Sequence, residues 1–143
     1  MLRYVIASHG TLSEGFLNAL GLFIGELDNV EAIAAFVDEE PLEKRVAAVL
    51  SRYDDDDMIV VFTDMLGGSV NQHFSKMLSG HRKLHLIAGC NLVLLLEVIL
   101  GMTDECDLNF IRSAVEKSKK EMVYMNDFML AAAGSGRSGE IDE

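Results

Sequence analysis

Three short polar segments hold the residues of this sequence whose types and spacing could do chemistry. They are Ser8-His9-Gly10, the run from Asp64 to Ser69, and Gly89-Cys90-Asn91. A histidine such as His9 can act as a nucleophile near neutral pH, because one nitrogen of the neutral ring keeps a free lone pair. The carboxylate of Asp64 could accept a hydrogen bond from the other nitrogen and so fix the tautomer of the ring. We therefore take both as candidate catalytic residues, although each taken alone also fits a structural role in a loop or turn.

Glycines and hydroxyl groups beside these residues suit the binding of an anion such as a phosphoryl group. Gly67, Gly68 and Ser69 would let backbone come close to the anion, and Ser69 adds a hydroxyl group. Gly10 and Thr11 stand where a helix is expected to begin, and a helix N-terminus offers free N–H groups and the positive end of a dipole. Glycines are common in loops, so it is the combination that favours a phosphate site.

Other kinds of functional site are not indicated. The sequence has no GxxxxGK[ST] nucleotide-binding loop, no HExxH metal motif and no GxSxG hydrolase motif. The other histidines, His73, His81 and His85, are scattered, so we expect no metal site and no cofactor. A magnesium-dependent phosphoacceptor role for Asp64 would need acidic residues after the first strand, where Ser8-His9 stands instead.

The segments that position these residues alternate between strand and helix patterns. Strand-like apolar runs occupy residues 2–7, 30–37, 58–63 and 84–88. Helical spacing of apolar residues is found at about 12–27, 41–53, 69–78, 92–100 and 109–120. This alternation predicts an α/β fold with a mainly parallel, doubly wound sheet flanked by helices. Because ligands of such folds bind beyond the carboxyl ends of the strands, the three polar segments should converge there.

Local signals refine the ends of these elements. Thr11 with Glu14, and Ser69 with Gln72, have the spacing of capping boxes at two helix starts. Residues 121–126 could add a short antiparallel edge strand. We expect one domain over residues 1–128, followed by a flexible C-terminal tail over residues 129–143.

Composition narrows the class of protein. The chain has 143 residues, of which 50% are hydrophobic, and this is enough for one domain with a full core. Twelve Lys and Arg residues against 23 Asp and Glu residues give a net charge of −11, which argues against binding to nucleic acids or anionic membranes. The longest apolar run, Leu92 to Leu100, is too short to span a membrane. Cys90 and Cys106 form no CxxC motif, so we expect reduced thiols and a cytoplasmic location.

The three polar segments together resemble the signature motifs of the IIA components of mannose-family sugar phosphotransferase systems. The matching segments are residues 4–10 with Gly15, residues 63–71, and residues 87–97. The first resembles the phosphorylation-site strand of that family, the second its D-x-x-G-G-S-P-x-N motif, and the third its G-x-N-L-P-M-L motif. The resemblance covers residues 2–126. Val70 and Val93 stand where the family has proline, and the first of these is a helix-start position where proline is not required.

The resemblance implies a phosphotransferase that works through a phosphohistidine intermediate. His9 would carry the phosphoryl group on a ring nitrogen, Asp64 would orient and activate the ring, and the Gly67-Gly68-Ser69 segment would hold the phosphate. The donor would be the phosphocarrier protein HPr, and the acceptor a IIB component whose membrane partners, IIC and IID, bind the sugar. The family forms homodimers, in some members by exchanging a short edge strand, for which residues 121–126 are the candidate.

Two alternative functions stay open on the sequence. One is the phosphotransfer subunit of a dihydroxyacetone kinase, which resembles this chain in its fold and in the Ser-His pair at the end of a strand. The other is a regulatory domain that has kept the fold without transferring phosphate. If the phosphocarrier reading holds, the acidic surface implied by the net charge could meet a basic face of the partner and speed their encounter.

Overall fold

Strands and helices alternate along the chain, as the sequence predicts. The structure, a computed structural model, describes residues 1–81, 83–102 and 106–134. Its elements are β1 (Leu2–His9), α1 (Leu12–Ile24), β2 (Val30–Ala35), α2 (Leu42–Leu50), β3 (Met58–Thr63), α3 (Ser69–Met77), η1 (Leu78–Gly80), β4 (Leu84–Ile87), α4 (Leu92–Gly101), α5 (Leu108–Ser118), η2 (Lys119–Glu121) and α6 (Met125–Gly134). The elements η1 and η2 are single turns of 3₁₀ helix that follow α3 and α5.

The four strands form one parallel sheet in the order β2-β1-β3-β4, which confirms the predicted α/β fold. The chain leaves β1 toward β2 on one side and then crosses to β3 on the other, so the strand order reverses between β1 and β3. In the register, His9 lies beside Ala35 and Ala7 lies beside Thr63. The residues that follow β1 and β3 therefore meet at the switch point, where parallel α/β sheets bind their ligands.

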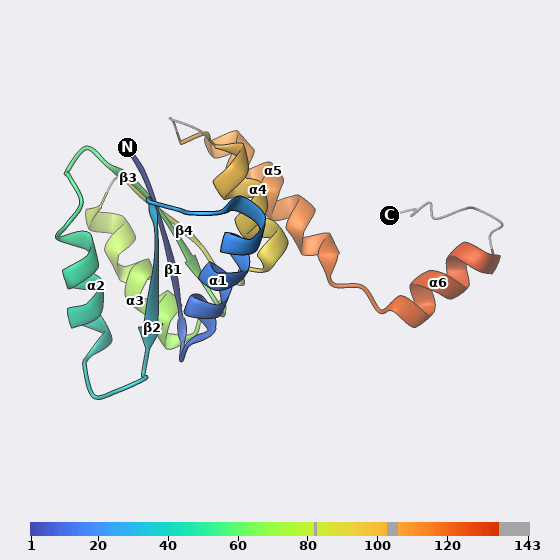
Figure 1. Cartoon of the computed structure of the whole chain (residues 1–143), viewed down its shortest axis with the longest axis horizontal. Coiled ribbons are helices and arrows are strands. Elements are labelled where there is room, and N and C mark those ends of the chain that lie inside the picture. The colour runs from blue at the N-terminus through green and yellow to red at the C-terminus, as the bar shows by residue number, and fades with distance from the viewer. Residues whose placement is uncertain (82, 103–105, 135–143) are drawn as a thin grey trace.

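Helices cover both faces of the sheet, with α1, α4 and α5 on one side and α2 and α3 on the other (Figure 1). Successive strand residues point to opposite faces, and most residues of β1 and β3 are apolar and buried, so both faces of these strands pack against helices. On the first face the largest fully buried side chains include Tyr4, Ile6, Phe62 and Leu95. On the second face Val5, Val61 and Phe74 are fully buried.

The second strand ends at Ala35, two residues before the predicted end at residue 37. Phe36 has a φ of 63° and is the one non-glycine residue of the described chain with a positive φ. A residue with a Cβ atom in this left-handed region costs about 1 kcal/mol or more. The N–H of Gly10 donates to the carbonyl of Ala35 at 2.7 Å, which ties this turn to the end of β1.

The capping box predicted at the start of α1 is not formed. Thr11 precedes the helix, but its side chain accepts no hydrogen bond from the first turn. The N–H of Ser13 instead donates to Oγ of Ser8 at 2.7 Å, and the Ser13 hydroxyl donates to the carbonyl of Ile33 at 2.9 Å. A serine of β1 thus caps the helix that follows, and it fixes the turn that contains His9.

The C-terminal part of the described chain differs from the sequence-based expectation. The strand predicted at residues 121–126 is wrong for the single chain, because η2 ends at Glu121 and α6 begins at Met125. Helix α6 also continues past residue 128, since the alanines of residues 131–133 are strong helix formers. It projects away from the rest of the molecule (Figure 1), and Leu130 is 73% exposed. The domain boundary at residue 128 stays a prediction, and residues 135–143 of the expected tail lie outside the described residues.

Within residues 1–81, 83–102 and 106–134, no helix is both long enough and apolar enough to cross a bilayer.

Candidate active site

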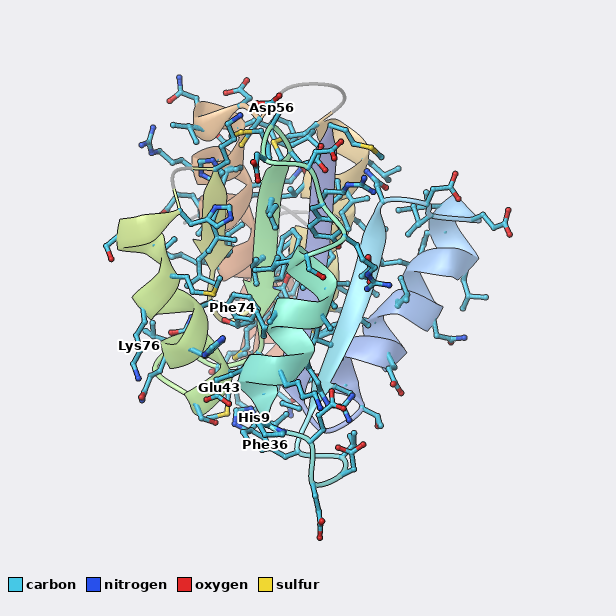
Figure 2. The ribbon with its side chains drawn as sticks, turned by 90° about the vertical axis from the view of Figure 1, so that its left-hand side faces the viewer. His9, Phe36, Glu43, Asp56, Phe74 and Lys76 are labelled. Atoms are coloured by element: carbon cyan, nitrogen blue, oxygen red, sulfur yellow. The ribbon has the colours of Figure 1, made fainter. Side chains whose placement is uncertain are left out.

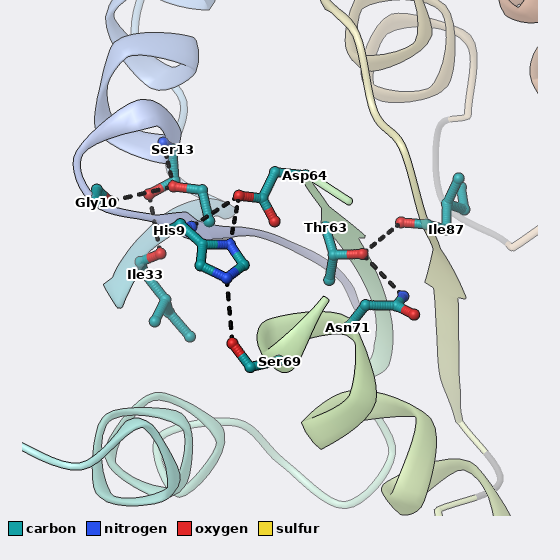
Figure 3. A network of polar contacts seen from close by, with 10 residues as sticks. His9, Gly10, Ser13, Ile33, Thr63, Asp64, Ser69, Asn71 and Ile87 are labelled. Atoms are coloured by element: carbon teal, nitrogen blue, oxygen red, sulfur yellow. Dashed lines mark hydrogen bonds and ion pairs between the residues drawn. The ribbon is translucent and has the colours of Figure 1, made fainter. Parts of the chain in front are cut away.

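The fold brings His9 and Asp64 together, as the sequence predicts for residues that follow neighbouring parallel strands. One carboxylate oxygen of Asp64, Oδ2, accepts two hydrogen bonds from His9 (Figure 3). The backbone N–H donates at 2.8 Å, and ring atom Nδ1 lies at 2.9 Å. Because the same oxygen holds both the backbone and the ring, the orientation of the imidazole is fixed relative to β1.

The electrostatic state of Asp64 sets the tautomer of His9. The Asp64 side chain is 8% exposed, and burial by itself would raise the pKa of its carboxyl group. The hydrogen bonds from the backbone and ring of His9, together with the attraction of the ring charge, outweigh burial and hold this pKa below its usual range. Asp64 is therefore a carboxylate at neutral pH and can only accept, so Nδ1 carries the proton. The neutral ring then has its lone pair on Nε2.

The Nε2 atom of His9 is directed to the hydroxyl group of Ser69, with Oγ at a distance of 3.1 Å. Ser69 is the first residue of α3, and Gly68 is the N-cap. The second predicted capping box is therefore wrong, because Ser69 does not cap the helix and Gln72 donates its side-chain amide to the carbonyl of Gly67. This leaves the Ser69 hydroxyl free to donate to Nε2. The His9 side chain is 40% exposed, so Nε2 can be reached from outside.

The two glycines before Ser69 have different structural roles. Gly67 has a φ of 76°, which makes the tight turn possible. A Cβ atom on Gly68 would lie 3.2 Å from Cε1 of His9 and 3.3 Å from Cβ of Met65, so the glycine permits a close approach of the ring. The N–H of Gly67 donates to Asn71 Oδ1, and the N–H of Gly68 donates to the Met65 carbonyl. The N–H groups left for an anion are therefore those in the first turn of α3, which lack partners inside the helix.

The turn that holds Gly10 and Thr11 lies directly after His9, at the start of α1. Gly10 has a φ of 60°, and its N–H donates to Ala35. As with the other glycines, its contribution is the shape of the turn. The hydroxyl group at this end comes from Thr11, and the N–H groups of the first turn of α1, except that of Ser13, are available to an anion.

The third polar segment supports the fold, and none of the contacts that the structure gives for it reaches His9. Asn91 caps α4 by accepting from the Leu94 N–H at 2.8 Å, and its amide group donates to the Ser118 carbonyl at 3.1 Å. The N–H of Cys90 donates to the carbonyl of Thr63 at 3.0 Å. Burial, aided by the nearby Asp64 carboxylate, raises the pKa of the Cys90 thiol to about 12, so this thiol stays protonated.

Sequence reasoning did not assign roles to two residues that shape the site. Asn71 donates to the hydroxyl of Thr63 at 3.0 Å, and its Oδ1 accepts from the N–H of Gly67, so it joins the end of β3 to the turn before α3 (Figure 3). The sequence did carry a sign of this role, because Asn71 is the last residue of the second motif. The second residue is Phe36, whose ring lies 5.4 Å from the His9 ring between centroids. Nothing in the sequence marks it, because it reads as part of a strand.

A groove of about 440 Å³ opens beside Phe36 and Ser69. One wall of the groove is acidic and includes Glu43, and the other carries polar and basic groups of α3, including Lys76. Figure 2 shows both side chains in the same half of the molecule as His9. The acidic wall consists of Asp38, Glu39, Glu40 and Glu43. Exposed apolar side chains also stand in the turns that follow β2 and β3, among them Val37, Met65 and Leu66. Among the described residues, no group of three potential metal-ligating side chains lies close enough together to hold an ion.

Comparison with known proteins places this site in a family. Residues 3–127 match the family model EIIA-man, the PTS system fructose IIA component. The fructose-specific EIIA component of the phosphotransferase system of Bacillus subtilis (strain 168) is 24% identical over 101 residues, which are 69% of each chain.

Two solved structures are similar over most of the chain. One, from Klebsiella pneumoniae, is named after the phosphoenolpyruvate-dependent sugar phosphotransferase system. It is 30% identical with a TM-score of 0.83, and the match covers 90% of this chain and 93% of that one. The other is the phosphotransferase system component EIIA of Streptococcus agalactiae. It is 26% identical with a TM-score of 0.72, and the match covers 89% of this chain and 99% of that one. The family match spans nearly all of the sheet and its covering helices, and the chain therefore belongs to the EIIA-man family of IIA components of the sugar phosphotransferase system.

Proposed function

We propose that His9 accepts a phosphoryl group on Nε2 from phosphorylated HPr and passes it to a IIB component. As a IIA component, the chain is a phosphotransfer protein of a sugar phosphotransferase system. The observation that carries the finer proposal is the order Asp64, His9, Ser69: the carboxylate holds Nδ1 at 2.9 Å, and Nε2 lies on the accessible side of the ring. The matched family and relatives belong to sugar phosphotransferase systems and do not favour the dihydroxyacetone kinase alternative.

The proposed transfer is a nucleophilic displacement at phosphorus. The lone pair of His9 Nε2 forms the new bond, while the bond between phosphorus and the donor nitrogen breaks and its electron pair returns to the donor. The proton on Nδ1 stays in its hydrogen bond to Asp64, whose negative charge stabilises the ring as it becomes positive. Transfer to the IIB component is the same reaction with His9 as the leaving group.

The phosphate oxygens would be bound by neutral groups. The candidates beside Nε2 are the Ser69 hydroxyl and the first N–H groups of α3. Further N–H groups lie at Thr11, where α1 begins, and the backbone of both turns is shaped by Gly10, Gly67 and Gly68. The polar contacts that the structure gives for His9 include no lysine or arginine. A site without a fixed cation binds phosphate less tightly, and this suits a group that must be passed on.

The surface around His9 suits docking of a protein partner. Exposed Val37, Met65 and Leu66 supply an apolar contact area, and the acidic wall of the groove supplies negative charge. A partner with an apolar patch and basic residues would complement it. We propose HPr and the IIB component as these partners, and through IIB the membrane subunits IIC and IID, with the chain itself in the cytoplasm.

Homodimer formation is the second part of the proposal. Helix α6 has ten residues, and Met125, Met129 and Leu130 are exposed. An isolated helix shorter than about 12–15 residues is marginal in water, so α6 needs a surface to pack against. We propose that a second copy supplies it, with residues 121–126 as the segment that could be exchanged; of these, residues 122–124 link η2 to α6 in the single chain. Light scattering on the intact chain and on Leu130→Asp tests this, and an intact chain that stays monomeric at micromolar concentration refutes it.

Phosphorylation by HPr tests the central proposal. The purified chain is incubated with phosphorylated HPr, and the bound phosphoryl group is followed by intact mass and located by peptide mapping under alkaline conditions. We expect labelling of the wild type and of the control His73→Gln, and none of His9→Gln. Labelled His9→Gln, or label found on His73, His81 or His85, would show that the assignment is wrong.

A further inference from the structure

Phe36 lies beside His9, and the proposed transfer gives it no role. It directly follows β2, whose last residue, Ala35, is the register partner of His9. This brings the two rings together, with centroids 5.4 Å apart and planes inclined by 38°. Figure 2 shows both side chains at the same end of the molecule. The contact therefore follows from the sheet register and the turn after β2.

The fold itself gains little from a phenylalanine at this position. Its φ of 63° is one that glycine adopts freely and that residues with a Cβ atom adopt rarely. The side chain is 58% exposed, so burial of the ring offsets little of this unfavourable backbone conformation. A strained backbone that persists without a packing reason points to a functional role.

We propose that Phe36 is a positioning residue that holds the His9 imidazole in place and keeps water away from a phosphoryl group on Nε2. The proposal rests on the phosphoryl transfer proposed above. Phe36 and Ser69 line the same groove, and Ser69 Oγ lies 3.1 Å from Nε2. A phosphoryl group on Nε2 therefore enters a space that has an apolar ring at its border.

The reaction that Phe36 opposes is hydrolysis of phosphorylated His9. The oxygen of a water molecule attacks phosphorus, the bond between phosphorus and Nε2 breaks, and its electron pair returns to Nε2. Both protons of the water remain on the released phosphate, and His9 is left neutral with its proton on Nδ1. An apolar ring excludes the attacking water, whereas a docked partner brings its own nucleophile into the same space.

The test measures phosphorylated His9 in the absence of any partner, so that a docking role of Phe36 does not enter. Wild type, Phe36→Gly, Phe36→Tyr and the control Phe23→Ala are labelled by phosphorylated HPr, which is then removed, and release of inorganic phosphate is followed. Phe23 is an exposed phenylalanine in the last turn of α1, about 16 Å along the helix from its His9 end. Imidazole NMR spectra of each unphosphorylated variant report the environment of the His9 ring.

We expect Phe36→Gly to shorten the half-life of phosphorylated His9 by about 2- to 10-fold, the range that one aromatic contact corresponds to. Its His9 ring resonances should move, while its urea midpoint stays equal or rises, because glycine relieves the backbone strain. Phe36→Tyr should keep the wild-type half-life and Phe23→Ala should match the wild type.

Three results would overturn the proposal, and the first two can be told apart from the third. If wild type is labelled at His9 and Phe36→Gly loses phosphate at the same rate, the role of Phe36 is refuted while the phosphoryl transfer stands. The same holds if Phe36→Tyr decays as fast as Phe36→Gly. If wild type takes no phosphoryl group at His9, the transfer itself is refuted and the shielding role falls with it.

Discussion

Replacement of Asp64 by asparagine is the sharpest perturbation of the site, because it keeps the shape of the side chain and removes its charge. Oδ2 accepts from the His9 backbone N–H at 2.8 Å and from Nδ1 at 2.9 Å. An amide group can donate to Nδ1, which would move the ring proton to Nε2 and occupy the nucleophilic lone pair. A hydrogen bond to a charged group contributes about 1.5–3 kcal/mol, so loss of the ring bond should slow phosphoryl transfer by about 10- to 100-fold.

Rapid-quench kinetics of transfer from phosphorylated HPr measures this effect, and NMR of the His9 ring reports its tautomer. Asp56→Asn is the matched control, because it makes the same chemical change at a fully exposed side chain at the opposite end of the molecule (Figure 2). We expect the control to transfer at the wild-type rate. If Asp64→Asn also transferred at that rate, with the proton still on Nδ1, then Asp64 would not orient the ring and the reasoning would be refuted.

Three further predictions concern the close approach at Gly68, the pH dependence of folding and the effect of salt. Gly68→Ala should slow phosphoryl transfer without unfolding the chain, because the added Cβ would force His9 or Met65 to move. The control in the same kinetic assay is Gly80→Ala, because a Cβ at Gly80 would meet no atom within 4 Å. Burial would raise the pKa of Asp57, but hydrogen bonds from the Asp54 N–H, the N-terminal ammonium and Arg3 lower it to about 2. The contribution of ionised Asp57 to stability is therefore complete above its unfolded-state pKa of about 4 and is lost as pH falls toward 2. Between about pH 4 and pH 2 the urea midpoint of wild type should fall more than that of Asp57→Asn. Midpoints that fall in parallel with pH would contradict this. Transfer from HPr should slow as salt rises, because the acidic wall beside His9 is screened, and a rate independent of salt would remove electrostatic steering from the account.

The sequence was sufficient to predict the elements that place His9 and Asp64. The strands β1 and β3 are mostly apolar, as strands buried on both faces must be, and a polar residue stands at the end of each. Parallel pairing of such strands then brings the two residues to one edge without further information. This is why the sequence alone predicts that His9 and Asp64 lie close together.

The predicted end of β2 and the predicted N-cap of α3 were wrong because both depend on backbone geometry, which residue types alone do not determine. Phe36 is as apolar as its neighbours, so its pattern continues the strand, whereas its left-handed φ ends it. Ser69 and Gly68 are both favourable N-cap residues, and the turn formed by Gly67 decides in favour of Gly68. This choice of one residue is what leaves the Ser69 hydroxyl for His9.

The strand expected at residues 121–126 is absent from the single chain for another reason. Residues 122–124 have the apolar, β-favouring character of a strand, but the single chain offers them no pairing partner, and they form the extended link between η2 and α6. The alanines that suggested a tail continue the helix instead. Strand formation by this segment is thus part of the exchange between two copies that we propose.

The position of the phosphoryl group on the His9 ring tests the central claim most directly. Two-dimensional ¹⁵N NMR of the phosphorylated chain, labelled at its histidines, distinguishes the two ring nitrogens. The hydrogen bond from Nδ1 to Asp64 predicts phosphorus on Nε2 and a proton retained on Nδ1. Phosphorus on Nδ1, or on any residue other than His9, would contradict the account.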